Sequence, residues 1–326
     1  MAEITLVEAV NLALAHELQA NGNVLVMGED VGVNGGVFRA TADLQQRFGA
    51  ERVLDTPLSE ALIAGMAIGM AAQGLRPVAE IQFMGFIYPA IDQMLNHASR
   101  LRTRTRGRLT CPLVLRAPFG GGIHAPEHHS ESTEALFAHI PGLRVVIPSC
   151  PLRAYGLLLA AIRDPDPVVF LEPKRIYRIT TQEVADNGEA LPLDSCFILR
   201  EGSNVTLVTW GAMTHETLQA ADDLAEQGIY AEVIDVATLK PLDMDTILQS
   251  VAKTGRCVIV HEAARSGGLG GEISAGIAEQ GLLHLLAPIE RVTGYDTVMP
   301  LFRLEQCYLP NKEQIIAAVQ KTLEFA

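Results

Sequence analysis

The stretch DTPLSEALIAGMAIGMAAQGLRPVAEI, residues 55–81, shows how this chain is built. A turn leads into an apolar helix expected at Ser59–Ala72, and Pro77–Ile81 is an apolar run typical of a buried strand. A helix that is followed directly by such a strand is the repeating unit of an α/β fold.

The same alternation continues on both sides of this stretch. Further helices are expected at Ile4–Ala20 (with Thr5 as its cap), Tyr88–Arg102, Leu152–Arg163, His215–Gln227, Asp243–Lys253, Gly271–Glu279 and Asn311–Glu324. Further strands are expected at Asn23–Met27, Leu113–Arg116, Arg144–Ile147, Pro167–Leu171, Val205–Thr209, Ala231–Asp235 and Cys257–His261. Only Tyr177–Pro192 is polar and irregular, and it contains the turn signal Asp186-Asn187-Gly188. We therefore predict two doubly wound α/β domains, 1–178 and 201–326, joined by a linker at 179–200.

Composition excludes several classes of protein. The chain has 326 residues, is 48% hydrophobic and carries a formal net charge of -13, so it can form a large core but lacks the basic footprint of a nucleic-acid binder. An acidic balance suits a basic protein partner instead. The five cysteines form no C-x-x-C pair, which argues against zinc ribbons and fits a reducing compartment. The first residues lack the pattern of a secretory signal, and the least charged stretch, Ala61–Leu75, is too short to span a bilayer. We expect a soluble, cytoplasmic protein that binds neither nucleic acid nor membrane.

Glu60 places a carboxylate at the start of the apolar helix, directly after a turn that contains Pro57. Within this helix Gly65 and Gly69 stand four residues apart, a spacing that lets two backbones approach closely. An acid in the first turn is also what the helix dipole favours, so these residues alone leave the role of Glu60 open.

The loop GGGIHAPEHHS, residues 120–130, places three histidines and a glutamate close together. A metal site is one interpretation, but Pro126 breaks any helix that would align the ligands, and no spaced partner set follows elsewhere. A histidine that acts on a substrate is a second interpretation, because loops on rigid scaffolds often carry function. A solvated polar loop is the third.

Two glycine-rich segments lie where a phosphate-binding loop would lie, next to a strand or a helix, but they lack its sequence pattern. Gly28–Gly32 follows a strand, and Gly267–Gly271 precedes a helix. Neither completes G-x-G-x-x-G or G-x-x-x-x-G-K-[ST], so nucleotide binding is poorly supported.

Motifs along nearly the whole chain resemble one family. They are GEDVG (28–32), GGVFRAT (35–41), DTPLSE (55–60), AEIQF (79–83), AIDQ (90–93), HHSES (128–132), PGLRVVIPS (141–149), FLEPKRIYR (170–178), AKTGR (252–256), HEA (261–263) and GYDT (294–297). In these motifs the chain resembles the beta subunit of the thiamine-diphosphate-dependent decarboxylating component of the pyruvate and branched-chain 2-oxo acid dehydrogenase complexes. The resemblance implies a transketolase-like pyrimidine-binding domain followed by a domain similar to the C-terminal domain of transketolase.

The resemblance gives several residues a role around the cofactor. It implies that Glu60 forms a hydrogen bond to the pyrimidine N1′ of thiamine diphosphate and favours the 4′-imino tautomer, whose nitrogen removes the proton at C2. It also implies that Leu58, Gln82 and Phe86 pack around the pyrimidine and that Glu29 is a second acid near the cofactor.

In the same way His129, rather than the adjacent His128, matches the histidine that faces the substrate. It is expected to bind the 2-oxo acid or to handle protons while the acyl group passes to the lipoyl group. The resemblance thus makes Glu60 and His129 the catalytic candidates.

The sequence also implies a missing partner. Thiamine enzymes usually hold the diphosphate through magnesium on a G-D-G motif, and this chain has no G-D-G. The resemblance assigns that motif to an alpha subunit in a heterotetramer of two alpha and two beta subunits. Some relatives also bind potassium, and Leu113, Ala161, Asp164 and Asp166 match that region, although Asp166 departs from the asparagine common there.

The substrate is the least determined feature. Phe86 and the GGGIHAPEHHSES loop favour pyruvate, whereas HEA, GYDT and FLEPKRIYR have a branched-chain character that would suit 3-methyl-2-oxobutanoate. Pockets separate such acids by only about 1–3 kcal/mol for each methylene. A further interpretation is a scaffold that docks the basic subunit-binding domain of the dihydrolipoyl acyltransferase component through its acidic surface. We expect pyruvate oxidation, with docking alongside it.

Overall fold

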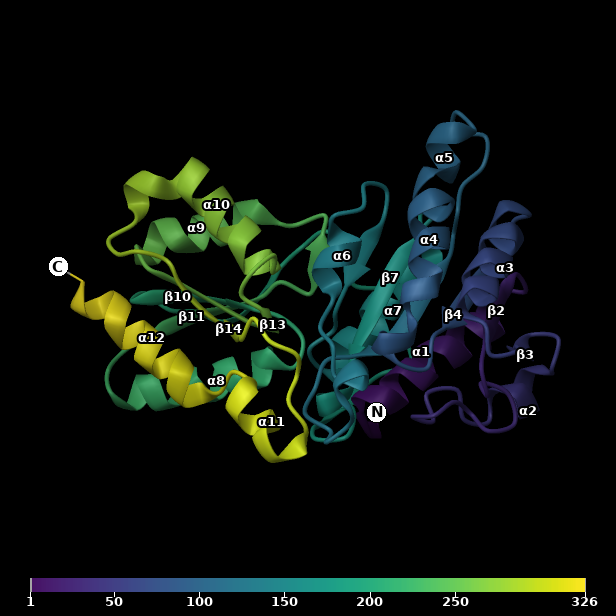
Figure 1. The fold of residues 1–326 in the computed structure, drawn as a ribbon, viewed down its shortest axis with the longest axis horizontal. Helices are drawn as coiled ribbons and strands as arrows, with labels where there is room; N and C mark the ends of the chain where they lie inside the picture. Colours follow the sequence, from purple (N-terminus) through teal and green to yellow (C-terminus); the bar gives the residue numbers. More distant parts are fainter. Residues whose placement is uncertain (1, 326) are drawn as a thin grey trace. The chain divides into compact units, whose positions relative to one another are not determined.

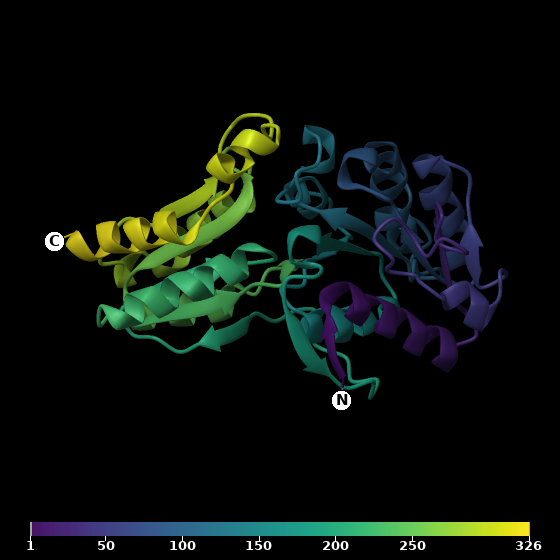
Figure 2. The same ribbon diagram turned by 90° about the horizontal axis from the view of Figure 1, so that it is seen from below.

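The computed structural model describes residues 2–325 and divides into two compact units (Figures 1 and 2). Unit 1 contains the chain up to Phe119 together with Leu136–Leu193, and unit 2 contains Gly120–Ala135 together with the chain from Asp194 onward. The break at residues 193 and 194 lies inside the expected linker, but the assignment of residues 120–135 to unit 2 has no counterpart in the sequence pattern. The domain limits 178 and 201 themselves stay predictions.

Unit 1 is built on a parallel sheet. Its strands β6 (Arg144–Val146), β7 (Val168–Pro173), β5 (Val114–Phe119), β4 (Arg76–Glu80), β2 (Val24–Gly28) and β3 (Val53–Asp55) lie side by side in that order, and each adjacent pair is parallel. Every residue of β2, β5 and β7 is buried, as expected for strands that are covered on both faces.

Helices cover this sheet in packed pairs. α1 (Leu6–Ala20) packs against α7 (Pro151–Arg163), and α3 (Glu60–Ala72) packs against α4 (Tyr88–Asn96). The short helices α2 (Leu44–Phe48), α5 (Leu101–Arg104) and α6 (Glu134–Ala138) lie in the connections. The expected helix at Tyr88–Arg102 is therefore too long, because the backbone leaves the α conformation at His97, and the hydroxyl of Ser99 donates to the carbonyl of Leu95 at 2.9 Å.

The N-terminus of α1 shows how local chemistry sets a boundary. Thr5 lies in an extended conformation before α1, and Glu8 Oε2 accepts from its backbone N–H at 2.8 Å and from its hydroxyl at 2.6 Å. Thr5 is thus the cap, as expected. Residues up to Thr5 form strand β1 (Ala2–Thr5), which pairs antiparallel with β8 (Thr181–Val184). The expected helix start at Ile4 and the expected irregular chain at Tyr177–Pro192 were therefore wrong. Each of these two short segments becomes a strand only by pairing with the other, which lies far away along the chain.

Unit 2 contains a second sheet, with the order β14 (Glu290–Gly294), β13 (Cys257–Ala264), β10 (Val205–Thr209), β11 (Ala231–Asp235) and β9 (Phe197–Arg200). All adjacent pairs are parallel except β11 with β9. In Figure 1, α9 (Met244–Thr254) and α10 (Leu269–Gly281) lie on one face of this sheet, with α8 (Met213–Glu226) and α12 (Lys312–Glu324) on the other. The short elements β12 (Thr238–Lys240) and α11 (Phe302–Tyr308) complete the unit. The predicted α/β class is confirmed.

The centre of the unit 1 sheet carries a buried ionic network. Arg116 on β5 is 1% exposed, and its guanidinium donates through Nε and Nη2 to the two carboxylate oxygens of Glu172 on β7, at 2.6 and 2.9 Å. Its Nη1 donates to Glu80 on β4 at 2.6 Å, and the hydroxyl of Tyr177 donates to Glu172 at 2.6 Å. Burial raises the pKa of Glu80, although Arg116 opposes this rise. One guanidinium thus joins three neighbouring strands.

Arg116→Met should destabilise the protein by about 3–5 kcal/mol, because it leaves two buried carboxylates without their cation. Urea unfolding, followed by circular dichroism, measures this change. The matched control is Arg102→Met, which breaks a half-exposed pair with Asp166 and should cost no more than about 1 kcal/mol. Equal losses for the two variants would contradict a central role for the buried network.

Candidate functional site

Glu60 is the first residue of α3, and the turn before it is tied to the neighbouring strand. The backbone N–H of Thr56 donates to the carbonyl of Gly28 at 2.9 Å, and Asp55 accepts from the N–H of Gly32 at 2.7 Å. Ser59 takes the extended conformation of an N-cap, so that Glu60 enters the first helical turn half-buried. These contacts hold the ends of β2 and β3 together and place Glu60 at the carboxyl edge of the sheet.

Glu29 follows β2 at the same edge. It is 6% exposed, and its pKa is raised first by burial and then by the negative charges of Glu60 and Asp30. Its Oε1 atom and the hydroxyl of Thr56 are both buried without a hydrogen bond to any residue that the structure describes. A polar ligand at this edge would satisfy both groups.

Gln82, Phe86 and Leu58 lie around the same edge. Gln82 follows β4 and is half-buried, as is Phe86 in the short helical turn Met84–Phe86, whereas Leu58 is 79% exposed. The rings of Phe86 and Phe83 meet edge to face with centroids 6.0 Å apart. In open parallel sheets ligands bind at the carboxyl ends of the strands, where all of these residues lie.

The glycine-rich segment after β2 is shaped by the buried network. Gly36 has a φ of +77°, and a Cβ there would lie 2.9 Å from Glu80 Oε1. Any larger residue would therefore collide with the carboxylate that pairs with Arg116. Gly28 and Gly36 thus lie against Glu80 of the ionic network, whereas Gly32 lies against Asp55 and Gly35 against Ala42. Close packing therefore explains these glycines without a phosphate loop.

His129 belongs to unit 2, in the short turn Glu127–His129 of the loop 120–135. The loop has internal bonds, from His129 N to the carbonyl of Pro126 at 3.0 Å and from Gly120 N to the carbonyl of Glu131 at 3.0 Å. The rings of His128 and His129 lie 4.1 Å apart. Within residues 2–325, no group of three or more His, Cys, Asp or Glu side chains is arranged to hold a metal ion.

Three carboxylates at the base of this loop carried no signal in the sequence beyond the HEA motif. Glu262 accepts from the N–H of Gly121 and from the hydroxyl of Ser132, the latter at 2.9 Å. Glu305 accepts from the N–H groups of loop residues 122 and 124, and Glu134 accepts from the indole N–H of Trp210 at 3.2 Å. Sequence reasoning missed them because Glu134, Glu262 and Glu305 stand far apart along the chain.

Family models match both units. Residues 2–180 match the pyrimidine-binding domain of transketolase, and residues 195–315 match the C-terminal domain of transketolase. The chain is 49% identical over 325 residues to the pyruvate dehydrogenase E1 component subunit beta of Bacillus subtilis, and 47% identical to that of Staphylococcus epidermidis, with each comparison covering all of both chains. This chain belongs to the family of beta subunits of thiamine-diphosphate-dependent 2-oxo acid dehydrogenases. A solved structure titled as a split-gene transketolase, an inactive beta4 tetramer, superposes on this beta subunit with a TM-score of 0.82 at 25% identity and covers 99% of both chains.

The edge of unit 1 in this beta subunit fits the pyrimidine half of the family's cofactor. Its acids Glu29 and Glu60 and the amide of Gln82 can meet polar ring atoms, and the orphaned Glu29 and Thr56 oxygens need a partner. Phe86 and Leu58 provide apolar surface beside them. These side chains therefore offer polar and apolar surface for a pyrimidine ring at this edge of the sheet.

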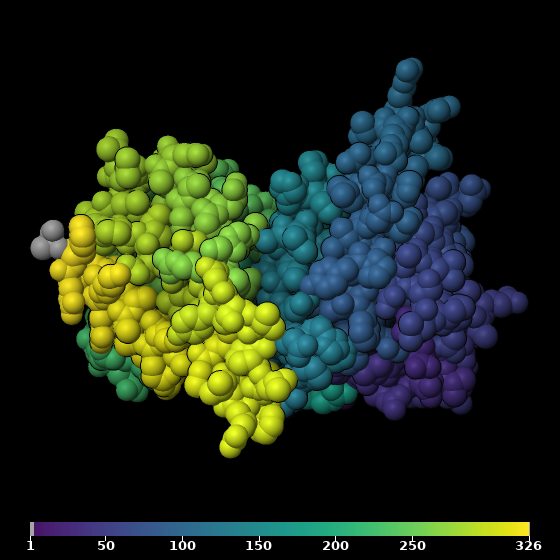
Figure 3. Space-filling model, viewed as in Figure 1, coloured from purple at the N-terminus to yellow at the C-terminus, as the bar shows by residue number. Residues whose placement is uncertain are grey.

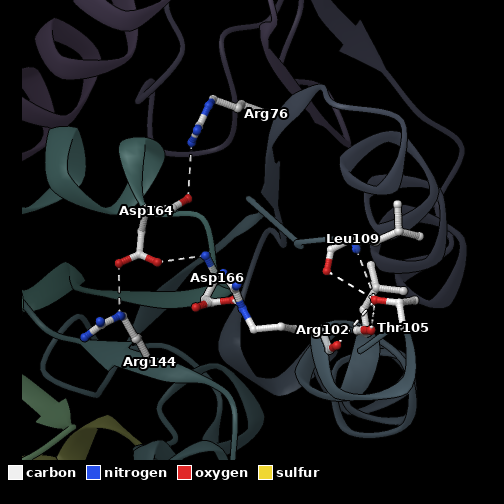
Figure 4. A network of polar contacts seen from close by, with 8 residues as sticks. Arg76, Arg102, Thr105, Leu109, Arg144, Asp164 and Asp166 are labelled. Atoms are coloured by element: carbon white, nitrogen blue, oxygen red, sulfur yellow. Dashed lines mark hydrogen bonds and ion pairs between the residues drawn. The ribbon is translucent and has the colours of Figure 1, made fainter. Parts of the chain in front are cut away.

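In the region that the resemblance associates with potassium, arginine side chains surround Asp164 and Asp166 in this beta subunit (Figure 4). Arg76 Nη1 donates to the carbonyls of Ile162 and Asp164 at 2.8 and 3.2 Å, and Arg144 pairs with the Asp164 carboxylate at 3.0 Å. Arg102 pairs with Asp166 at 2.7 Å. The carbonyl of Leu113, in turn, accepts from the N–H of Val168 at 2.9 Å, and Ala161 lies in the last turn of α7. Three guanidinium groups already bind oxygens of Asp164 and Asp166, and their positive charge would repel a further cation, so the residues do not fit a potassium site.

Glu29→Gln should raise the midpoint of thermal unfolding at pH 8 without cofactor. Glu29 has a pKa above its ordinary value of 4.5, so folding favours its protonated form, and stability falls as pH rises from 4.5 through the raised pKa. Glutamine removes that loss, and the difference between variant and wild type should vanish below about pH 4.5. Differential scanning fluorimetry at both ends of this range measures it. A variant less stable than wild type at pH 8 would contradict the idea that burying the charged Glu29 side chain destabilises the fold.

Potassium and sodium, at equal ionic strength, should give the same midpoint of thermal unfolding for the wild type. Arg76→Met frees two carbonyl oxygens at the end of α7 and should make the midpoint higher in potassium than in sodium. If the wild-type midpoint of thermal unfolding were higher in potassium than in sodium, the protein would bind potassium and the argument against this site would be wrong.

Proposed function

We propose that this chain is the beta subunit of a pyruvate dehydrogenase, the component that decarboxylates pyruvate oxidatively and passes the acyl group to the lipoyl group of a dihydrolipoyl acyltransferase. The observation that carries the proposal is identity of 49% along the full length of a relative named as a pyruvate dehydrogenase subunit. The phenylalanine at position 86 and the half-buried Glu60 at the sheet edge support it.

Bound thiamine diphosphate would supply the carbanion at C2 that attacks the keto carbon. Glu60 would hold a hydrogen bond at the pyrimidine N1′ and so control which tautomer of the ring is present. Glu29 would take up a proton more readily than an ordinary glutamate, because burial and the charge of Glu60 raise its pKa. Leu58, Gln82 and Phe86 would fix the plane of the ring and exclude water from it.

His129 would bind the substrate carboxylate or carry a proton during acyl transfer. The loop that carries it has backbone hydrogen bonds of its own, which place the backbone of His129 in a short turn. Its task needs a group whose charge changes near neutral pH, which histidine alone offers among unperturbed side chains.

The proposal requires a second chain. Magnesium near the diphosphate needs oxygen ligands, and this sequence has no G-D-G motif to supply them. We therefore propose a heterotetramer of two such chains with two alpha subunits that hold the magnesium. The acidic net charge of -13 suits docking of a basic subunit-binding domain from the acyltransferase. We propose that this complex is cytoplasmic. No helix within residues 2–325 combines the length and apolarity needed to cross a bilayer.

The test uses this chain co-expressed with its candidate alpha subunit, thiamine diphosphate and magnesium. Dye reduction should give a higher kcat/KM with pyruvate than with 3-methyl-2-oxobutanoate. The reverse preference would assign the chain to branched-chain oxidation, and no activity with either acid in an assembled complex would overturn the proposed reaction.

Glu60→Gln should lower kcat for decarboxylation by about 10²–10⁴-fold, because the amide cannot exchange a proton with N1′. Size-exclusion chromatography should show an unchanged complex, which separates chemistry from assembly. Glu51→Gln, an exposed acid just before β3, is the control and should keep full activity. If Glu60→Gln stayed fully active, the chain would be a scaffold rather than part of the catalytic machinery.

A further inference from the structure

The glycine loop 120–135 in unit 2 is bound by buried carboxylates at several points. Its internal backbone bonds, including those from His129 to Pro126 and from Gly120 to Glu131, determine its shape. They do not attach it to the sheet of unit 2. The attachment comes from side chains of two other elements, Glu262 on β13 and Glu305 on α11.

Glu305 forms the most specific of these attachments. It is 1% exposed, and its two carboxylate oxygens accept separately from the backbone N–H of Gly122 at 2.8 Å and of His124 at 3.2 Å. Gly122 and His124 both have positive φ, +87° and +59°, so that their N–H groups turn toward one point. Converging backbone N–H groups of this kind form an anion-binding nest, which Glu305 fills from within the chain.

Glu262 forms the second attachment and explains the first glycines of the loop. It accepts from the N–H of Gly121 and from Ser132, at opposite ends of the loop. A Cβ on Gly120 would lie 2.8 Å from Glu262 Oε1, and one on Gly121 would lie 2.6 Å from the Met299 side chain. The glycines therefore permit the close approach that brings the backbone N–H to the carboxylate.

The far end of the loop has a third attachment. Glu134 is fully buried, accepts from the indole of Trp210, and Trp210 stacks on His261 with ring centroids 5.1 Å apart. Burial raises the pKa of Glu134 to about 7, and the charge of Glu262 adds to this rise. Trp210 is the single tryptophan of the chain, so its fluorescence reports on this end of the loop.

We propose that Glu305 and Glu262 are positioning residues, which fix the loop 120–135 and thereby the place of His129. The inference rests on the proposed function only in assigning a catalytic task to His129. The attachment of the loop by Glu305 and Glu262, which we call the clamp, follows from the hydrogen bonds alone. α11 lies on the surface of unit 2, in the yellow part of the chain in Figure 3. Its residues Phe302 and Leu304 are exposed, whereas Glu305 of the same short helix is buried.

Glu305→Gln is the decisive variant. Glutamine has one acceptor oxygen, so its NH₂ group would face one of the two backbone N–H groups, and that contact would be lost. Hydrogen exchange of the full chain, co-expressed with its alpha subunit, should become at least about tenfold faster for the amides of Gly122 and His124, in line with about 1.4 kcal/mol lost per factor of ten. Trp210 fluorescence should stay unchanged, because Glu134 keeps its own partner.

Activity provides the second readout. In the assembled complex, Glu305→Gln should lower kcat/KM for the 2-oxo acid by about 10–100-fold, since small displacements of a catalytic group are costly. The midpoint of thermal unfolding should change little. Glu305→Asp keeps both acceptors and should recover part of the lost kcat/KM, and Glu279→Gln, an exposed acid on α10, should behave as wild type.

The outcomes separate the clamp from the proposed reaction. Unchanged exchange at Gly122 and His124 in Glu305→Gln would overturn the clamp, whatever the activity. Faster exchange with unchanged kcat/KM would overturn the positioning of His129. Faster exchange in a complex whose wild type uses no 2-oxo acid would support the clamp and reject the proposed function.

Discussion

The burial of Arg116 is the constraint on which unit 1 depends. A guanidinium in the middle of a parallel sheet can be tolerated only if each of its donors finds an acceptor, and Glu172 and Glu80 supply them from the two neighbouring strands. The three strands must therefore keep their register relative to one another. Because one cation faces two carboxylates, burial leaves Glu80 with a raised pKa and an oxygen that faces the segment Gly28–Gly36.

This constraint extends to the edge where the cofactor contacts are proposed. Gly36 lies against Glu80, Gly28 accepts from the turn before α3, and that turn sets the start of the helix at Glu60. The backbone that carries the acids at the sheet edge is thus tied to the buried strands by hydrogen bonds and close contacts. Such support is what a site needs if its side chains are to keep their geometry without a ligand.

Unit 2 solves a related problem in the opposite sense. In unit 1 two carboxylates accept hydrogen bonds from a buried cation. In unit 2 the carboxylates of Glu262 and Glu305 accept hydrogen bonds from backbone N–H groups of the loop 120–135. A buried carboxylate must be satisfied, and glycines let backbone N–H groups come close enough to donate to it. The same requirement therefore explains both the glycines at 120–122 and the acids that stand far from them in sequence.

The sequence by itself determined the α/β class, the buried strands β10 and β11 at their observed limits, the cap at Thr5 and the place of Glu60 at a helix start. These features depend on hydrophobic periodicity and local capping, which are written within a few residues. Only the tertiary structure decided the pairing of β1 with β8, the arginines around Asp164 and Asp166, and the carboxylates beneath the loop 120–135. Each of these depends on contacts between residues far apart along the chain, where a pattern in one segment carries no information about its partner.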